Sequence, residues 1–125
     1  VGLPMDGVEE DRRLGKRGVR AAAVHPGGIQ TELGRHLTPE LIAQLMPAGP
    51  STFKFKTIPQ GAATSVWAAV VADPAEIGGK YCEDCHVAEL QEGEGIRSGV
   101  RPYALDAEHA KALWAKSEEM VGERF

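Results

Sequence analysis

Cysteine is scarce in this chain, long apolar runs are missing, and basic residues do not outnumber acidic ones. Two cysteines, behind an N-terminus without the basic start and apolar centre of a signal peptide, favour a reduced, cytoplasmic protein. No stretch approaches the roughly 20 apolar residues that a membrane span needs. With 18 acidic against 14 basic residues, the net charge of -4 argues against nucleic acid or an anionic membrane as the main partner.

The remaining composition is typical of a globular protein. Of the 125 residues, 42% are hydrophobic and 26% are charged, and a chain of this length is expected to form a single domain over 1–125. Apolar residues over Val19–His25 and Lys80–Cys85 predict two strands, the first covered on both faces as in a parallel sheet. Helices are expected between and around these strands, so the sequence predicts an α/β fold.

Helix-end signals and helical spacing predict four helices. They are expected at Val8–Lys16, stopped by Gly18; at Glu40–Met46, opened by Thr38-Pro39; from the Thr57–Gln60 capping box to Asp73-Pro74; and after Asp106. Buried positions are predicted at Ala62, Ala63, Val66, Trp67, Val70 and Val71 of the third helix and at Ala110, Leu113, Trp114 and Val121 of the last. The acids at 9–11 are interpreted as a solvated helix face.

The most informative stretch, Val19–Leu33, runs from the first strand straight into a Pro-Gly turn. Pro26 ends the strand at its carboxyl edge, where open α/β sheets bind ligands. Gly27 and Gly28 let the backbone approach a flat ring because no Cβ intervenes. Thr31 offers a hydroxyl and an amide to a carboxamide or phosphate. Taken alone, this motif also fits a plain strand-ending turn.

Later segments make the pattern specific to one family. K-T-I-P-Q-G-A-A-T over 56–64, G-G-K-Y-C-E-D-C over 78–85 and Y-A-L-D over 103–106 come in the order found in short-chain dehydrogenases/reductases. The segment over 11–21 is similar to the end of the helix that carries that family's catalytic Tyr and Lys. The chain therefore resembles the C-terminal half of a short-chain dehydrogenase/reductase, in the retinol-dehydrogenase-like and WW-domain-oxidoreductase-like branch.

This resemblance implies a partial doubly wound, Rossmann-like sheet, built from the family's last two parallel strands with flanking helices. It also implies NAD(P)-dependent oxidoreduction of a small lipophilic alcohol or carbonyl, over which the segment 32–55 closes. Pro26, Gly27 and Thr31 match positions that contact nicotinamide in the family, and Gly28 completes the predicted turn for NAD or NADP.

The family's catalytic groups are missing from these 125 residues. No lysine has a tyrosine four residues before it, and no G-x-x-x-G-x-G precedes a helix. In the family the tyrosine donates a proton, the lysine lowers its pKa and holds the ribose, and the glycine-rich loop anchors the pyrophosphate. We therefore expect no catalytic residue here. Two hypotheses stay open: a truncated or split enzyme completed by an N-terminal half, or a non-catalytic binding or dimerisation module.

An unpaired edge on the first strand predicts a homo-oligomer.

Cys82, Cys85 and His86 spell the C-x-x-C-H pattern of c-type haem attachment, and with His109 they suggest a zinc site. Both interpretations are disfavoured because residues 82 and 85 of one strand point to opposite faces. We predict no metal and two half-buried structural thiols instead. His25 has two interpretations, as a base beside the cofactor turn or as a strand-end residue hydrogen-bonded to backbone.

Overall fold

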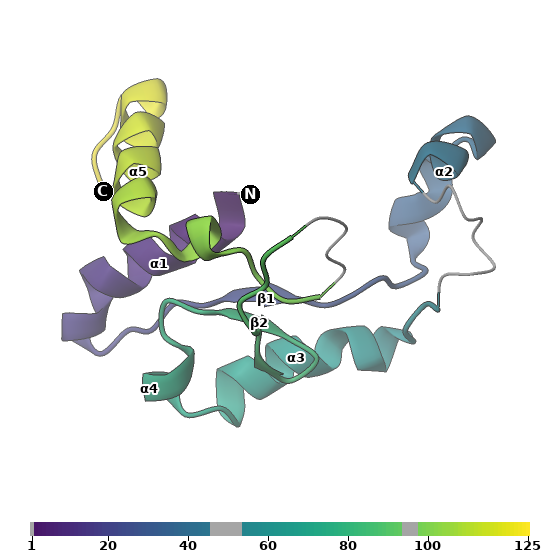
Figure 1. Cartoon of the computed structure of the whole chain (residues 1–125), viewed down its shortest axis with the longest axis horizontal. Helices are drawn as coiled ribbons and strands as arrows, with labels where there is room; N and C mark the ends of the chain where they lie inside the picture. Colours follow the sequence, from purple (N-terminus) through teal and green to yellow (C-terminus); the bar gives the residue numbers. More distant parts are fainter. Residues whose placement is uncertain (1, 46–53, 94–97) are drawn as a thin grey trace.

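The computed structural model describes residues 2–45, 54–93 and 98–125. Its strands form one small sheet flanked by helices, which confirms the predicted α/β class (Figure 1). In chain order the elements are α1 (Gly2–Leu14), η1 (Gly15–Arg17), β1 (Ala23–His25), η2 (Glu32–His36), α2 (Pro39–Leu45), α3 (Ile58–Val70), α4 (Pro74–Ile77), β2 (Tyr81–Glu83), β3 (His86–Val87), η4 (Pro102–Leu105) and α5 (Ala107–Val121).

The sheet has the order β1-β2-β3. β1 and β2 are parallel, with His25 opposite Glu83, whereas β3 runs antiparallel to β2. The expected strand Lys80–Cys85 was too long, because Asp84 and Cys85 have positive φ angles of 46° and 60°. Two such residues form a tight hairpin turn, which sends the chain back along β2 as a third, unpredicted strand.

The expected strand Val19–His25 is also shorter in the structure, and its cover on both faces was wrong: only Ala23 is buried. The Asp11 carboxylate accepts hydrogen bonds from Arg20 and from the backbone N–H of Ala21. These bonds tie the start of the segment to α1. Among the described residues, no strand pairs with the other edge of β1.

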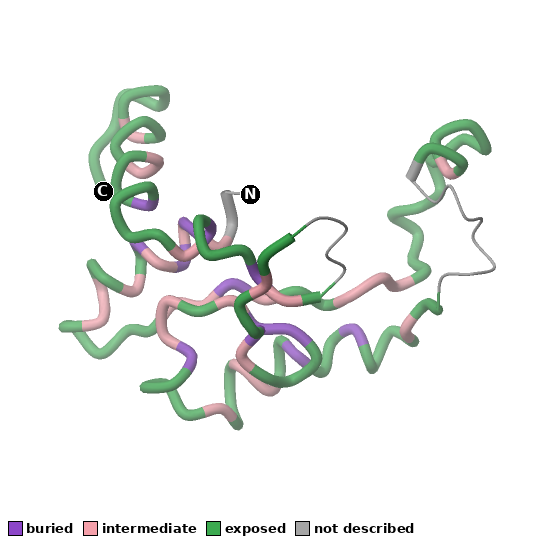
Figure 2. Tube along the Cα trace, viewed as in Figure 1, coloured by how far each residue is buried: buried purple, intermediate pink, exposed green. Residues whose placement is uncertain are grey.

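In Figure 1, α1 and α5 lie above the strands and α3 and α4 lie below them. Figure 2 shows that buried positions gather around the strands and where α1 meets α5, while the part of the chain around α2 is largely exposed. The predicted end of α2 at Met46 lies outside the described residues, as do Pro47–Pro50 and Gly95 of the predicted loops.

Helix α1 begins earlier than predicted and ends at Leu14, two residues before the predicted Lys16. The 3-10 helix η1 follows, and the predicted stop at Gly18 is confirmed as its left-handed C-cap. Its acids were predicted to face solvent, which is wrong for Glu9, whose exposed fraction is 1%. Arg12 and Arg13, one turn along the helix, hold its carboxylate by hydrogen bonds of 2.7 and 2.8 Å. Two charged partners make the burial of this carboxylate tolerable.

Helix α3 begins with the predicted capping box, in which the Thr57 hydroxyl accepts from the Gln60 N–H and the Gln60 side chain accepts from the Thr57 N–H. Its predicted buried face was wrong. Gly61 and Thr64 are buried against the rest of the chain, while the valines at 66, 70 and 71 are 56%, 76% and 69% exposed. Ile29, in the segment after β1, packs so closely on Gly61 that a Cβ there would lie 2.5 Å from Cγ1 of Ile29.

The Asp73-Pro74 pair does more than close α3, because Asp73 caps α4 through the N–H of Ala75. Asp106 caps α5 as predicted, accepting from the N–H groups of Glu108 and His109. Ala110 is buried, but Val121 is 62% exposed, contrary to prediction. In Figure 1 the last turns of α5 extend beyond α1, which accounts for this exposure.

Candidate functional site

The segment 26–31, predicted as the cofactor turn, follows β1 at the carboxyl edge of the parallel strand pair. It forms neither a hydrogen-bonded turn nor a bend, so the predicted turn geometry was wrong, and the turn is kept below only as a name for this segment. Gly27 has a φ of 89°, a conformation that glycine adopts without strain, and both it and Gly28 are half-buried. The Gly28 carbonyl accepts from the N–H of Lys56 at 2.9 Å, and Ile29 forms a parallel bridge with Lys56. The segment that leads into α3 therefore fixes the turn along one side.

Thr31 lies at the far end of this turn and is exposed. Its hydroxyl accepts from the N–H of Leu33 at 3.4 Å and so caps η2, and its carbonyl accepts from Gly34. The hydroxyl that was predicted to contact a ligand is thus also the N-terminal cap of η2.

A cavity of about 990 Å³ opens directly beside the turn. Ile29, Gln30 and Thr31 from the turn contribute to its wall. The other lining residues come from η2 and its C-cap, from α2, and from the segment that leads into the first residue of α3: Glu32, Leu33, Gly34, Arg35, Leu37, Ile42, Phe55 and Ile58. Most of these side chains are apolar, and pockets of this size and character are common binding sites for small lipophilic molecules.

The sequence analysis missed the role of Lys56, whose side chain connects the turn to the β2–β3 hairpin. Its ammonium donates to the Pro26 carbonyl at 3.3 Å and forms an ion pair with Asp84. This ion pair lowers the pKa of the Asp84 carboxyl. Lys56 is the first residue of the 56–64 motif, but the sequence contained no signal of this contact because its partners lie 30 and 28 residues away.

His25 is exposed at the end of β1, and its ring stacks on that of Tyr81 with 6.3 Å between centroids. Burial, together with the nearby charge of Glu83, raises the pKa of the Tyr81 hydroxyl. The structure therefore gives His25 an aromatic neighbour at the sheet edge, where it also lies close enough to Asp84 to help lower the pKa of that carboxyl.

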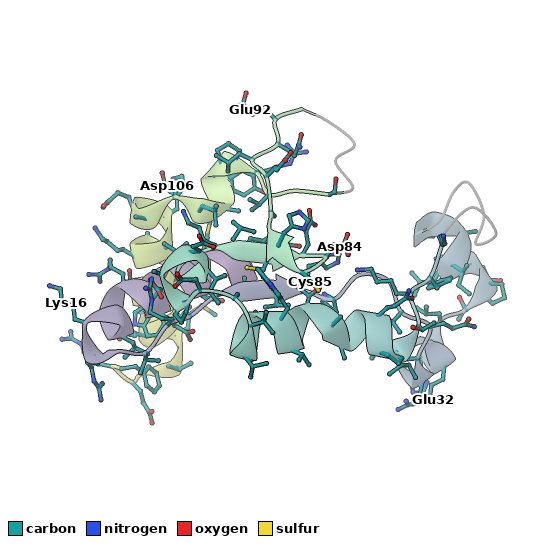
Figure 3. The ribbon with its side chains drawn as sticks, turned by 90° about the horizontal axis from the view of Figure 1, so that it is seen from below. Lys16, Glu32, Asp84, Cys85, Glu92 and Asp106 are labelled. Carbon is teal, nitrogen blue, oxygen red and sulfur yellow. The ribbon has the colours of Figure 1, made fainter. Side chains whose placement is uncertain are left out.

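The two cysteines have different surroundings, so the prediction of two half-buried thiols was wrong. Cys82 is fully buried in β2, and this burial raises the pKa of its thiol. Cys85 is exposed at the tip of the hairpin, and Figure 3 shows it beside Asp84. Within residues 2–45, 54–93 and 98–125, no three of the His, Cys, Asp and Glu side chains are grouped as metal ligands.

Comparison with known proteins gives a consistent relationship. The chain is 39% identical to the short-chain dehydrogenase/reductase prx1 of Penicillium rubens over 114 residues, and this match covers 90% of the chain. It is 37% identical to mouse retinol dehydrogenase 14 over 89% of the chain and 36% identical to the human WW domain-containing oxidoreductase over 94%. This chain belongs to the short-chain dehydrogenase/reductase family. The resemblance that the sequence motifs indicated is thereby confirmed.

The match covers only part of each relative. This chain spans 34% of the length of the Penicillium protein, 30% of the mouse protein and 25% of the human one. No family model and no solved structure matches the chain. In the described part of the chain, none of the helices has the length and apolar character that crossing a membrane requires.

Proposed function

We propose that this chain carries the nicotinamide-facing turn and the substrate cavity of an NAD(P)-dependent oxidoreductase. The observation that carries this proposal is the position of the Pro26–Thr31 turn. It lies at the carboxyl edge of parallel strands and shares Ile29 and Thr31 with the apolar cavity. Ligands of open α/β sheets bind at this edge, so one molecule in the cavity and one at the turn would meet there.

The residues of the turn fit a nicotinamide ring. Gly27 and Gly28 present backbone without a Cβ, and Gly27 adopts the left-handed φ of 89° directly after Pro26. When bound, the nicotinamide of NAD or NADP supplies the hydride acceptor or donor. The chain's own part is to orient that ring against backbone and to keep water from it.

The cavity supports a lipophilic alcohol or carbonyl as the substrate. Leu33 and Leu37 bring apolar side chains to its wall from η2 and its C-cap, and Phe55 does so from the segment before α3. Burying such a molecule against them gains roughly 25 cal/mol for each Å² of apolar surface removed from water. A polar end of the substrate would then point towards Thr31 and the turn.

Catalysis needs a proton donor that these residues do not include, since no Tyr-x-x-x-Lys occurs among them. We infer that this pair and the phosphate-binding loop come from another segment, of the same polypeptide or of a second one. The purified 125-residue chain is therefore expected to oxidise no alcohol and reduce no carbonyl with either nicotinamide cofactor.

The test is reconstitution with a segment that carries both missing motifs, taken from the region of a relative that precedes the matched part. The mixture should turn over a long-chain alcohol, the two parts alone should not, and Thr31→Ala should lower the rate of the mixture. Turnover by the chain alone that is lost on Thr31→Ala would overturn the proposal. A folded complex without turnover would favour a non-catalytic binding or dimerisation module instead.

A further inference from the structure

The side chain of Lys56 lies flat along Gly27 of the turn. A Cβ built on Gly27 would be 2.8 to 2.9 Å from the Nζ, Cε and Cδ atoms of Lys56, so the lysine stem occupies the space that glycine leaves open. Beyond this contact the ammonium reaches the Pro26 carbonyl at 3.3 Å and the Asp84 carboxylate. One side chain thus contacts the turn at two successive residues.

Backbone contacts anchor both ends of this arrangement. The N–H of Lys56 donates to the Gly28 carbonyl at 2.9 Å, so the lysine is fixed to the turn by its main chain as well as its side chain. On the other side, the N–H of Cys85 donates to the Thr64 hydroxyl at 3.3 Å, which holds the hairpin tip against α3. Asp84 is therefore presented from a fixed position, and Figure 3 shows it at the end of the hairpin.

We propose that Lys56 is a positioning residue that holds the Pro26–Gly28 turn in the shape that receives a nicotinamide ring, and that Asp84 holds Lys56 in place. The inference rests on the proposed function and names the side chains that control its cofactor turn. Lys56 acts through the backbone of Pro26, Gly27 and Gly28. It is not a catalytic residue.

Charge around Asp84 favours this arrangement near neutral pH. Lys56 is the main influence that lowers the pKa of the Asp84 carboxyl, and His86 and His25 add positive charge when protonated. The pair therefore persists above the ordinary pKa of an aspartate and is lost only as the pH falls through the lowered value. Lys56 is 28% exposed and Asp84 61%, so the pair is partly screened by solvent.

A direct role for Lys56 makes the opposite prediction for Asp84. If the ammonium contacted a phosphate of the cofactor itself, removing the competing carboxylate would leave cofactor affinity unchanged or raise it. If Lys56 positions the turn, removing that carboxylate releases Lys56 and weakens binding. Asp84→Asn separates these two roles, and because Asp84 is exposed this substitution is not expected to disturb folding.

The experiment titrates NAD into the ¹⁵N-labelled 125-residue chain and follows the amide signals of Gly27 and Gly28. Lys56→Met and Asp84→Asn should shift both signals before NAD is added and weaken NAD binding by about threefold, as expected for a part-exposed pair. Lys56→Arg should retain the wild-type signals and affinity. Lys54→Met, which changes an exposed lysine two residues away, is the matched control and should change neither.

The inference is overturned if the Gly27 and Gly28 signals are unchanged in Lys56→Met, or if Asp84→Asn binds NAD equally or more tightly. In either case the proposed function still stands, provided that the wild-type signals respond to NAD. If wild type itself shows no response to NAD at the turn, the proposed function fails, and the role of Lys56 towards nicotinamide fails with it. Circular dichroism of each variant confirms that the fold is retained; if Lys56→Met is unfolded, Asp84→Asn decides.

Discussion

The guanidinium of Arg13 lies over the indole ring of Trp114, with 4.6 Å between its Cζ atom and the ring centroid. The same guanidinium donates to the Glu9 carboxylate at 2.8 Å and to the Phe125 carbonyl at 2.7 Å. Trp114 in turn donates from its ring nitrogen to Glu118 at 2.9 Å. Arg13 therefore connects α1 to α5 and to the residues that follow α5.

Replacing Arg13 by leucine should destabilise the protein by ~1–2 kcal/mol. The variant loses a cation–π contact of about 0.5–1 kcal/mol and one of the two partners of a buried carboxylate. Urea unfolding followed by tryptophan fluorescence measures this. Arg17→Leu, at an exposed position in η1, is the control and should change stability by less than about 0.5 kcal/mol.

Stability should fall in acid partly through Glu9. Hydrogen bonds from Arg12, and next from Arg13, lower the pKa of the Glu9 carboxyl from 4.5 to about 2 in the folded chain. Because the folded pKa is the lower one, this contribution is fully present above pH 4.5 and is lost as the pH falls through about 2. It amounts to ~2 kcal/mol once solvent exposure of the arginines is allowed for.

Urea midpoints of wild type and Glu9→Gln, measured between pH 6 and pH 2, test this effect of Glu9. Several other carboxylates, including Asp11 and Asp84, also have lowered pKa values, so both proteins should weaken in acid. The difference between them isolates Glu9: wild type should be more stable near pH 6, and the gap should close towards pH 2. A gap that stays constant with pH contradicts the role assigned to Glu9.

Gly27→Ala should destabilise the turn by ~1–2 kcal/mol and weaken NAD binding. Alanine is strained at a φ of 89°, and its Cβ would collide with the stem of Lys56. Gly34→Ala is the control, since a Cβ there meets only Leu37 at 3.8 Å and no positive φ is involved. Thermal unfolding of the two variants should separate them; equal midpoints would contradict this account of the turn.

The chain should self-associate at micromolar concentration. The outer face of α3 exposes Val66 and Val70 by 56% and 76%, and within the described residues nothing pairs with the free edge of β1. Such edges and apolar patches favour association. Sedimentation equilibrium should give a mass above 13.4 kDa, and Val70→Lys should lower it. A folded wild-type monomer would contradict this prediction.

The sequence correctly predicted the structural features that depend on residues close together along the chain. The Thr57–Gln60 capping box and the Asp106 cap were found because the residues that make each cap are three or fewer positions apart. The order of β1, α2, α3, β2 and α5 was likewise predicted, whereas α4 and β3 were not. The predicted buried face of α3 was wrong because helical spacing selects a stripe of valines but not the side that meets the rest of the chain. The side that packs contains Gly61, which lies against Ile29, and Thr64.

The candidate site was predicted only in its backbone. Pro26, Gly27, Gly28 and Thr31 belong to one short continuous segment, so sequence order was enough to bring them together. The pairing of Lys56 with Asp84 depends instead on the hairpin after β2, whose left-handed turn residues are aspartate and cysteine rather than the glycine that usually marks such a turn. No local pattern predicted that hairpin.

The most direct test of the central claim compares NAD with ADP-ribose, which has the same pyrophosphate but no nicotinamide ring, in titrations of the ¹⁵N-labelled chain. NAD should shift the amide signals of Gly27, Gly28 and Thr31, with a dissociation constant of about 1 mM or weaker because no phosphate loop is present. ADP-ribose should leave these signals in place, and nicotinamide mononucleotide should reproduce the effect of NAD. Equal shifts with ADP-ribose, or no response to NAD at the Pro26–Thr31 turn, would contradict the claim that this turn receives nicotinamide.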